Sequence, residues 1–262
     1  MDFKKAFDSL HRSSIWKILK LYGIPIKIIN LIKLFYDKYE CAVLLKGKFS
    51  EWFNVKTGVR QGCILSPILF LITIDWVLRQ TCDRPRGIQW TLVKHLEDLD
   101  FADDLALISR TVGNLQIKTN RLVDYAQMTG LRINVPKTKT MHLSRPPSIP
   151  LKIKDEEIES VENFTYLGSI ISPKDGAAKD ITNRLNKAKA AFVMLRPVWI
   201  SQQYSRTTKL RIFRSNVITT LLYGAECWRC TDSDMMRLER FQRKCLRYIL
   251  RIWWPNVISN QN

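Results

Sequence analysis

The sequence predicts an α+β chain, with a sheet-containing first part and a helical, basic second part. In the first part, short runs of alternating apolar residues are separated by turn residues, as at 41–45 and 96–108, and such alternation is typical of antiparallel strands. In the second part the strand signals fade and long basic amphipathic helices dominate. We therefore expect a boundary near Ser172 to Asp175, which divides the 262 residues into segments 1–172 and 173–262.

Helices in the first part are predicted from apolar residues at helical spacing between capping residues. Pro25 favours a helix start and Gly130 a helix end, because proline fits the first helical turn and glycine adopts the left-handed conformation after the last. The expected helices cover residues 15–21, 25–35, 66–76 and 114–128. Strand signals predict a hairpin around Gly47 and a short antiparallel pair within 153–171.

An acidic pair, Asp103 and Asp104, lies between two apolar, strand-like runs. The pattern predicts a hairpin with the two carboxylates at its tip. Such a turn can hold a divalent ion, because hard cations such as Mg²⁺ prefer oxygen ligands. The alternative is a solvated hairpin tip, since aspartate favours turns for local hydrogen-bonding reasons.

Asp2, at the start of the chain, is a further candidate ligand. Two-metal chemistry requires carboxylates that bridge both ions, and these can come from separate strands. Asp2 together with the distant pair Asp103 and Asp104 fits this requirement. The alternative for Asp2 is an exposed residue near a frayed terminus.

A loop with two glycines, residues 57–67, is the third candidate element. Its glycines, Gly58 and Gly62, permit unusual backbone angles and the close approach of a flat ligand. Arg60 is suited to meet a phosphate, Gln61 is suited to hydrogen-bond a sugar or a base, and the helix start that follows favours anions. The alternative is a loop-to-helix junction without a ligand.

The balance of charges points to a polyanionic partner. Lys and Arg number 42 against 24 Asp and Glu, a formal net charge of +18, which is too large to serve solubility alone. Nucleic acid is the first candidate and an anionic membrane surface the second, although the basic residues are spread over helices rather than gathered in one cluster. Basic faces suited to track a phosphate backbone are expected on three helical stretches. They comprise Arg184, Lys187 and Lys189; Lys209, Arg211 and Arg214; and Arg237, Arg240, Arg243, Lys244 and Arg247.

The sequence argues against membrane, secreted and zinc-binding proteins. No stretch approaches the length of about 18 uncharged apolar residues that a transmembrane helix needs, and the first residues lack the apolar run of a secretory signal. The six cysteines are scattered, and Cys227 and Cys230 form a lone CxxC pair without the four ligands of a zinc site. We therefore expect reduced thiols, no zinc, no membrane partner and an intracellular location, nuclear or cytoplasmic.

These blocks, in this order, resemble the reverse transcriptases of non-LTR (LINE-type) retrotransposons, in particular those of the RTE, CR1 and Jockey-like groups. The segments that carry the resemblance are 2–8 for motif A, 60–62 with 66–67 for motif B, 101–104 in its FADD form for motif C, 130–139 for motif D and 164–168 for motif E. Segments 222–228 and 245–250 resemble the helical part that follows the polymerase core in these elements.

The resemblance implies a right-hand polymerase fold, in which an antiparallel palm sheet packed with helices is followed by a helical thumb. It places the palm, with motifs A to E, in residues 1–172 and the thumb-like region in 173–262, and it implies that the turn 166–168 holds the primer end. In the family a fingers region precedes motif A, so we expect the fingers to be largely absent and the chain to be truncated at its N-terminus.

The implied reaction is RNA-directed DNA synthesis, with an RNA template, a DNA primer and deoxynucleoside triphosphates as partners. Asp2 and Asp103 are the principal expected metal ligands, with Asp104 beside them and the carbonyl of Phe3 as a further ligand. The expected ions are two Mg²⁺, with Mn²⁺ as a substitute. One alternative is a non-catalytic nucleic-acid-binding remnant that keeps the basic helices, and another is a maturase-like splicing helper that shares the palm.

The resemblance assigns further positions to the nucleotide. Phe7 falls where the family keeps a bulky residue against the sugar 2′ position, since an aromatic ring there clashes with an added hydroxyl; a core aromatic is the alternative. Gln61 and Gly62 are expected to line the pocket for the incoming nucleotide and template. Lys137 is expected near the triphosphate as a charge stabiliser or general acid, with Lys139, or no role beyond a surface lysine, as the alternatives.

Overall fold

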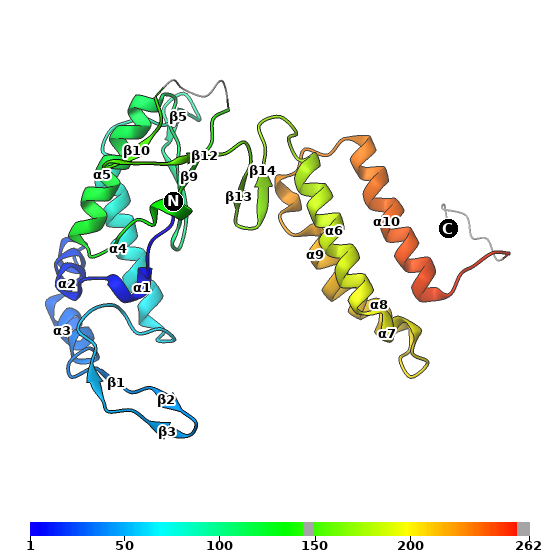
Figure 1. Cartoon of the computed structure of the whole chain (residues 1–262), viewed down its shortest axis with the longest axis horizontal. Helices are drawn as coiled ribbons and strands as arrows, with labels where there is room; N and C mark the ends of the chain where they lie inside the picture. The colour runs from blue at the N-terminus through cyan, green and yellow to red at the C-terminus, as the bar shows by residue number, and fades with distance from the viewer. Residues whose placement is uncertain (144–148, 256–262) are drawn as a thin grey trace. The chain divides into compact units, whose positions relative to one another are not determined.

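The computed structural model describes residues 1–143 and 149–255. The chain, drawn as a ribbon in Figure 1, divides into two compact units, Met1–Val161 and Glu162–Asn262. Each unit has its own hydrophobic core. The mixture of helices and small sheets agrees with the α+β class expected from the sequence. The division into segments 1–172 and 173–262 rests on expected roles and stays a prediction.

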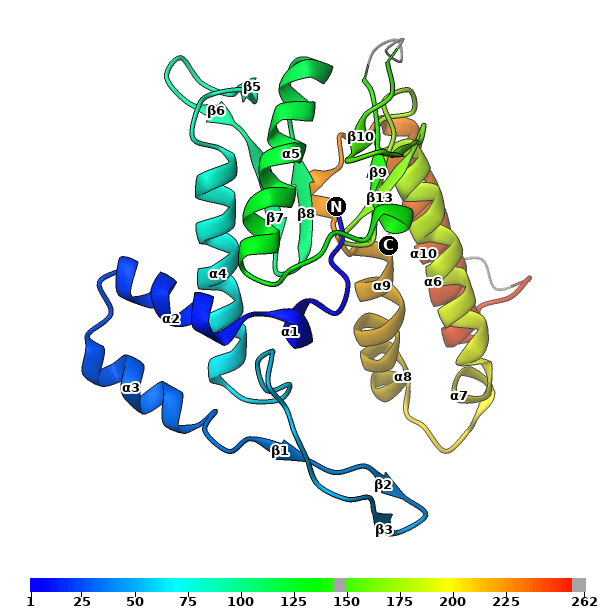
Figure 2. The same ribbon diagram turned by 60° about the vertical axis from the view of Figure 1, so that its left-hand side comes forward.

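Helices form the framework of the first unit. They are α1 (Ala6–Ser9), α2 (Arg12–Leu21), α3 (Ile26–Leu34), α4 (Leu65–Thr81), α5 (Val112–Met128) and the 3₁₀ helix η1 (Val135–Lys137). The helices expected from the sequence correspond to α2, α3, α4 and α5, so their existence is confirmed. Helix α4 continues past the expected end at residue 76, because Val77 and Leu78 extend its buried face. Helices α4 and α5 lie side by side (Figure 2).

The strands of the first unit are short and pair in twos. They are β1 (Glu40–Cys41), β2 (Leu44–Leu45), β3 (Lys48–Phe49), β4 (Phe53–Asn54), β5 (Ile88–Gln89), β6 (His95–Leu96), β7 (Asp98–Phe101), β8 (Asp104–Leu107), β9 (Lys139–Thr140), β10 (Lys152–Ile153), β11 (Glu156–Glu157) and β12 (Glu159–Ser160). The antiparallel pairs are β1–β4, β2–β3, β5–β6, β7–β8 and β10–β11, whereas β9 and β12 pair in parallel.

Two hairpins were expected outside the acidic tip, and both are present. The hairpin around Gly47 is confirmed by the pairing of β2 with β3. The short antiparallel pair expected within 153–171 is confirmed by the pairing of residues 164–166 with 169–171. The remainder of this stretch differs, because β11 pairs with β10 and β12 joins β9.

The first residues of the chain extend the sheet beside β8. Met1 and Leu105 exchange both backbone hydrogen bonds, and the Leu105 nitrogen lies 3.3 Å from the Met1 carbonyl oxygen. On the opposite side, Phe3 forms an antiparallel bridge with Ile133. The segment that carries Asp2 is therefore held between β8 and the chain that follows α5.

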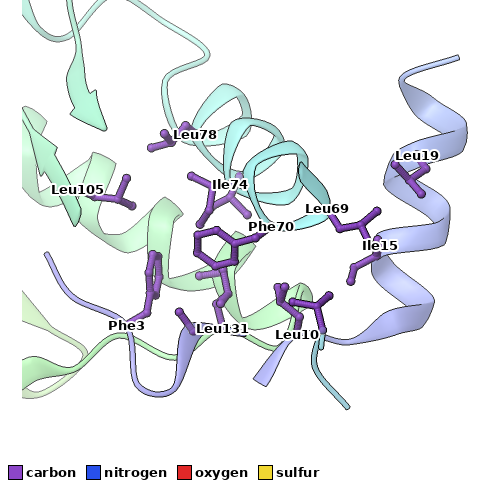
Figure 3. Packing of buried hydrophobic residues seen from close by; sticks show 14 of the residues in the cluster. Phe3, Leu10, Ile15, Leu19, Leu69, Phe70, Ile74, Leu78, Leu105 and Leu131 are labelled. Atoms are coloured by element: carbon purple, nitrogen blue, oxygen red, sulfur yellow. The ribbon is translucent and has the colours of Figure 1, made fainter. Parts of the chain in front are cut away.

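The core of the first unit packs against one face of β8 and of the segment formed by the first three residues. Phe3 and Leu105, 5% and 1% exposed, belong to the cluster around Phe70 of α4 (Figure 3). Side chains alternate between the two faces of an extended strand. Burial of Phe3 and Leu105 therefore turns their neighbours Asp2 and Asp104 away from the core.

The second unit is a hairpin followed by helices. Its elements are β13 (Phe164–Tyr166), β14 (Ser169–Ile171), α6 (Ala178–Met194), α7 (Arg196–Ile200), α8 (Arg206–Ile212), the π-helical segment η2 (Phe213–Ile218), α9 (Thr219–Leu222), the 3₁₀ helix η3 (Ala225–Cys227) and α10 (Asp232–Leu250). Buried side chains of α6, η2 and α10, among them Leu185, Phe213 and Phe241, form its core with Trp199. Within the described ranges of both units, no helix combines the length and apolar character needed to cross a bilayer.

Candidate functional site

The expected metal ligands lie on adjacent strands. Met1 and Leu105 form a reciprocally hydrogen-bonded pair, which is the antiparallel pattern. In that register the next residue of one strand faces the preceding residue of the other, so Asp2 lies opposite Asp104. Residues directly opposite each other have Cβ atoms about 4.5–5.5 Å apart. The structure therefore brings together two carboxylates that are separated by about a hundred residues in the sequence.

The turn that carries Asp103 is strained. Strands β7 and β8 pair up to Phe101 and Asp104, which leaves Ala102 and Asp103 as a two-residue loop. Ala102 has φ of 56°, in the left-handed region that favours glycine. Two-residue hairpin loops require positive φ at their first central residue. A non-glycine residue held there costs on the order of 1–3 kcal/mol, and such strain clusters at functional sites.

Lys137 lies beside Asp2. Its Nζ is 3.4 Å from Oδ2 of Asp2, and the Asp2 carbonyl accepts a hydrogen bond of 2.8 Å from the Asn134 nitrogen, just before η1. The alternative lysine, Lys139, instead pairs with Glu159 across the β9–β12 pair. Of the two, Lys137 is thus the one in contact with a candidate ligand.

The oxygen atoms of the candidate ligands suit a hard divalent cation, but in the observed arrangement they do not surround one. Asp2, Asp103 and Asp104 offer only carboxylate oxygens, and Phe3 adds a backbone carbonyl; these are the donor types that Mg²⁺ prefers. Across residues 1–143 and 149–255, no group of three or more acidic, histidine or cysteine side chains is gathered closely enough to hold a metal ion. In the observed arrangement the three carboxylates therefore do not converge on one point.

Phe7 packs against the core with one face. Its ring stacks on Phe70 of α4, with ring centroids 4.6 Å apart and an interplanar angle of 15°. The ring is only partly buried. The core contact that was the alternative for Phe7 is therefore present, and the expected role beside the sugar stays a prediction.

The glycine loop is docked on the segment that follows Asp2. The Val59 nitrogen donates to the Phe7 carbonyl at 2.8 Å. Gly58 has φ of 78°, and a Cβ built on it would lie 2.7 Å from the Asp8 Cα, a distance that real Cβ atoms do not adopt. Only glycine therefore lets the loop come this close to α1. Gln61 adds a side-chain contact, from Nε2 to the Asp8 Oδ1 at 3.2 Å.

The next loop residues differ in their surroundings. Gly62 has φ of 83°, and within the described part of the chain a Cβ added there would meet open space. Arg60 stacks its guanidinium over the ring of Tyr39, 4.2 Å from the centroid. The Arg60 Nε is buried and has no hydrogen-bond partner among the described residues. Tyr39 was not predicted from the sequence as the partner of Arg60.

A buried lysine, which was not predicted from the sequence, closes the base of the acidic hairpin. Lys118 of α5 is fully buried and donates to the carbonyl oxygens of Glu97 and Ile108 at 2.6 and 2.9 Å, and to the Glu97 carboxylate at 2.7 Å. Burial opposes ionisation of Glu97, but Lys118 and the backbone N–H groups of Gly87 and Arg86 outweigh it and lower the pKa of the carboxyl. The sequence does contain a signal for this buried lysine, because Lys118 lies on the apolar face of α5 between Leu115 and Leu122.

Two of the basic residues expected to face nucleic acid do not do so. Arg184 and Lys209 are buried, 6% and 5% exposed. Lys209 donates to the carbonyl oxygens of Trp199 and Ser201 at 2.8 and 2.6 Å. Their assignment to basic faces was wrong, because the helices turn these positions toward carbonyl groups of neighbouring segments. The exposed members of the expected set are Lys187, Lys189, Arg211, Arg214, Arg240, Lys244 and Arg247.

Residues 1–171 match the model of the reverse transcriptase (RNA-dependent DNA polymerase) family, and this match covers more than half of the chain. The chain therefore belongs to the reverse transcriptase family, which has a palm-type polymerase fold. Residues 191–223 also match a domain of unknown function.

Its relatives are polymerases of non-LTR retrotransposons. The chain is 29% identical to the retrovirus-related Pol polyprotein from the type-2 retrotransposable element R2DM of Drosophila melanogaster, over 79% of this chain and 21% of that protein. It is 25% identical to the type-1 R2 polyprotein of Nasonia vitripennis, over 96% of this chain and 25% of the relative. It is 24% identical to the RNA-directed DNA polymerase from mobile element jockey of Drosophila melanogaster, over 97% and 28%. The chain thus spans only about a quarter of the length of these relatives.

Proposed function

We propose that this chain is the polymerase region of a non-LTR retrotransposon reverse transcriptase and that it extends a DNA 3′ end on an RNA template. The observation that carries the proposal is the antiparallel register that sets Asp2 opposite Asp104, with Lys137 in contact with Asp2. In the proposed reaction the primer 3′ hydroxyl attacks the α-phosphate of a deoxynucleoside triphosphate and pyrophosphate leaves. The protein contributes mainly orientation and electrostatic stabilisation.

Asp2, Asp103, Asp104 and the carbonyl of Phe3 would hold two Mg²⁺ ions, for which Mn²⁺ can substitute. Their oxygen-only donor set supports this choice of metal. When bound, such ions lower the pKa of an attacking hydroxyl and stabilise the leaving oxygen. The Asp2 segment is held by backbone hydrogen bonds on both sides, and the β7–β8 pairing extends to Asp104, which supports a defined position for these ligands.

Lys137 carries its positive charge next to the proposed ligands. With Nζ 3.4 Å from the Asp2 carboxylate, it can neutralise the departing pyrophosphate or donate a proton to it. Its side chain is 71% exposed, so it can turn from Asp2 toward a triphosphate. Lys139 is held by Glu159, which makes it the weaker candidate.

The glycine loop and Phe7 are proposed to shape the nucleotide pocket. Gln61 and Gly62 would face the base and the template. The guanidinium of Arg60 stacks on Tyr39 with one face, and the N–H groups at its edge would bind a phosphate. The Phe7 ring, fixed by its stacking on Phe70, would clash with a ribose 2′ hydroxyl and so favour deoxynucleotides.

We assign the palm role to residues 1–172 and the thumb role to residues 173–262. The β13–β14 turn at Tyr166, Leu167 and Gly168 would hold the primer end. The exposed basic side chains of the second unit would contact the phosphates of an RNA–DNA duplex, which agrees with the net charge of +18.

Primer extension on an RNA template tests the proposal. We expect Mg²⁺-dependent extension by the wild-type chain and a loss of about a hundredfold or more in Asp103→Asn, because bridging carboxylates are essential to two-metal catalysis. Asp155→Asn, which removes an exposed carboxylate in the β10–β11 turn, is the matched control and should extend normally. Extension that survives in Asp103→Asn would show that the acidic hairpin is not the active site.

A non-catalytic nucleic-acid-binding remnant is the second candidate function. It is favoured because, within the described ranges, no three acidic, histidine or cysteine side chains are gathered closely enough to hold a metal ion. Such a remnant would bind an RNA–DNA duplex with an affinity that falls steeply with salt, and it would extend no primer with either Mg²⁺ or Mn²⁺. The same assay therefore separates the two functions.

A further inference from the structure

A buried ion pair on α6 faces the β13–β14 hairpin. Asp180 and Arg184 are 3% and 6% exposed. Oδ1 of Asp180 accepts a hydrogen bond of 2.9 Å from the Ile170 nitrogen of β14, and Oδ2 accepts one of 2.9 Å from Nε1 of Trp228. One carboxylate thus connects the hairpin to the segment that follows α9.

Arg184 makes the second connection. Its Nη2 donates to the Gly168 carbonyl at 2.7 Å and lies 3.4 Å from the Ser169 Oγ. The guanidinium lies over the ring of Tyr223, 4.5 Å from its centroid. Within the described residues the Arg184 Nε has no hydrogen-bond partner and is 4.0 Å from Asp180. The arginine is therefore held by the turn and the aromatic ring as much as by the carboxylate.

The turn itself needs external support. Leu167 and Gly168 both have positive φ, 49° and 80°, as the two-residue type I′ hairpin loop requires. Leucine in this conformation costs about 1–2 kcal/mol relative to its usual backbone. Hydrogen bonds from Arg184 to the turn offset this cost and favour one conformation of the loop.

The segment 223–228 closes against the same turn. A Cβ built on Gly224 would lie 2.8 Å from the Ser169 Oγ, and Gly224 has φ of 76°. A Cβ at this position would force the Ser169 hydroxyl to move, and the positive φ of Gly224 is strained for any other residue. Together with the ring of Tyr223 and the indole of Trp228, Gly224 forms a backing for Arg184 and Asp180.

We propose that Arg184 and Asp180, backed by Tyr223, Gly224 and Trp228, are positioning residues that fix the Leu167–Gly168 turn and act on the primer end through it. The inference rests on the proposed function, in which this turn holds the primer. Two charges buried together do not by themselves favour folding, because desolvation offsets their attraction. The network instead favours one conformation of a strained loop. It also gives a role to the segment 222–228, which resembles the helical part that follows the polymerase core in this family.

The experiment combines hydrogen exchange with single-nucleotide primer extension by the full chain. In Arg184→Met and in Tyr223→Leu we expect exchange at Ser169 to Ile171 to accelerate by about tenfold or more, as local opening becomes easier. The extension rate should fall by about tenfold and the Kd for primer–template should rise severalfold, while KM for the nucleotide stays within about twofold. Tyr223→Phe keeps the ring beneath Arg184 and should restore both readouts.

Controls separate positioning from folding. Asn186→Ala alters an exposed residue of the same helix and should match the wild type. Exchange in α10 should be unchanged in all variants, and Tyr223→Leu, at a side chain 56% exposed, serves if Arg184→Met does not fold.

Several outcomes would overturn the inference. Unchanged exchange at Ser169 to Ile171 would show that the network does not hold the turn. Faster exchange with normal primer affinity and rate would show an anchor without a positioning role. A wild-type chain that extends no primer would overturn the proposed function and the positioning role with it, whereas the exchange measurement would still decide whether Arg184 fixes the turn.

Discussion

At the scale of single residues, burial determines the chemistry of the cysteines. Burial raises the pKa of Cys82 to about 12, and the hydrogen bond of 3.1 Å from its thiol to Asp98 adds to this effect. Burial in the helical core raises the pKa of Cys245 to about 12. Cys227 and Cys230 are exposed. Since only the thiolate is a strong nucleophile, the partly buried thiol of Cys82 and the buried thiol of Cys245 are chemically protected.

We predict an order of alkylation from these environments. At pH 8, iodoacetamide should modify Cys227 and Cys230 first, and Cys82 and Cys245 should react only after the chain is unfolded in urea. Peptide mass spectrometry over a time course measures this order. Modification of Cys82 as fast as Cys227 in the folded chain would contradict the raised pKa of the Cys82 thiol.

At the scale of elements, the β7–β8 hairpin is fixed at both ends. Its tip contains the strained Ala102, and its base is closed by Lys118, which bridges the carbonyl groups just outside the two strands. The carboxylate of Glu97 completes this base. The tip that we propose to be catalytic is therefore supported at its base by the buried Lys118 of α5.

We predict that Lys118→Met destabilises the chain by about 3 kcal/mol at neutral pH, because it leaves Glu97 without its buried partner. The folded-state pKa of Glu97 is lowered, so its contribution to stability is present above its unfolded pKa and is lost as the pH falls through the folded one. The deficit of the variant should therefore shrink below about pH 4. Urea unfolding of the wild type and the variant, from neutral pH to below about pH 4, measures this difference in the free energy of unfolding.

Lys94→Met provides the control for this prediction, since Lys94 is exposed in the β5–β6 turn. Its effect should stay within about 0.5 kcal/mol at every pH. A deficit in Lys118→Met that does not change with pH would show that Glu97 is not the group responsible.

The contact between the glycine loop and α1 gives a second prediction at this scale. Gly58 and Gly47 both have φ of 78°, but only Gly58 faces the Asp8 backbone, whereas Gly47 faces open space within the described residues. Gly47→Ala should cost about 1 kcal/mol, the backbone term alone. Gly58→Ala should cost markedly more and should also reduce primer extension, because the loop must move away from α1. Thermal unfolding compares the two, and equal losses would contradict the close contact.

The elements also show what the sequence could and could not reveal. Helices α2 to α5 and the acidic hairpin were predictable, because caps and apolar periodicity are local features. The roles of Lys118 and Arg184 were not, because their partners are carbonyl groups from segments distant in the sequence. The pairing of β9 with β12 was missed for the same reason: two-residue strands carry too little periodicity to determine a partner.

The candidate site divides in the same way. The residue types at Asp2, Asp103 and Asp104 predicted oxygen ligands, and the register of Met1 with Leu105 agrees with their expected proximity. The sequence left open whether Lys137 or Lys139 contacts Asp2, because the local geometry of the 3₁₀ helix and the following strand decides which lysine lies beside it. The stacking of Arg60 on Tyr39 had no signal in the spacing of the glycine loop.

At the scale of the whole molecule, the net charge of +18 predicts salt-dependent binding of nucleic acid. For a labelled RNA–DNA duplex, log Kd should rise linearly with log salt. Lys187→Gln and Lys244→Gln should each reduce the slope by about one if these side chains contact phosphates. Lys209→Met should leave the slope unchanged, because this lysine is buried and bonded to carbonyl groups. A smaller slope in Lys209→Met would contradict its buried placement.

The ring of Tyr223 beneath Arg184 has a consequence for how genomic copies of such elements are judged. A copy that retains every aspartate of its motifs but has lost that ring, or has gained a side chain at Gly224, should extend primers more slowly, by about tenfold for loss of the ring. Screens for mobile copies that inspect only the acidic signature would count such a gene as intact. Inspection of positions 223 and 224 would remove it from the list of candidates.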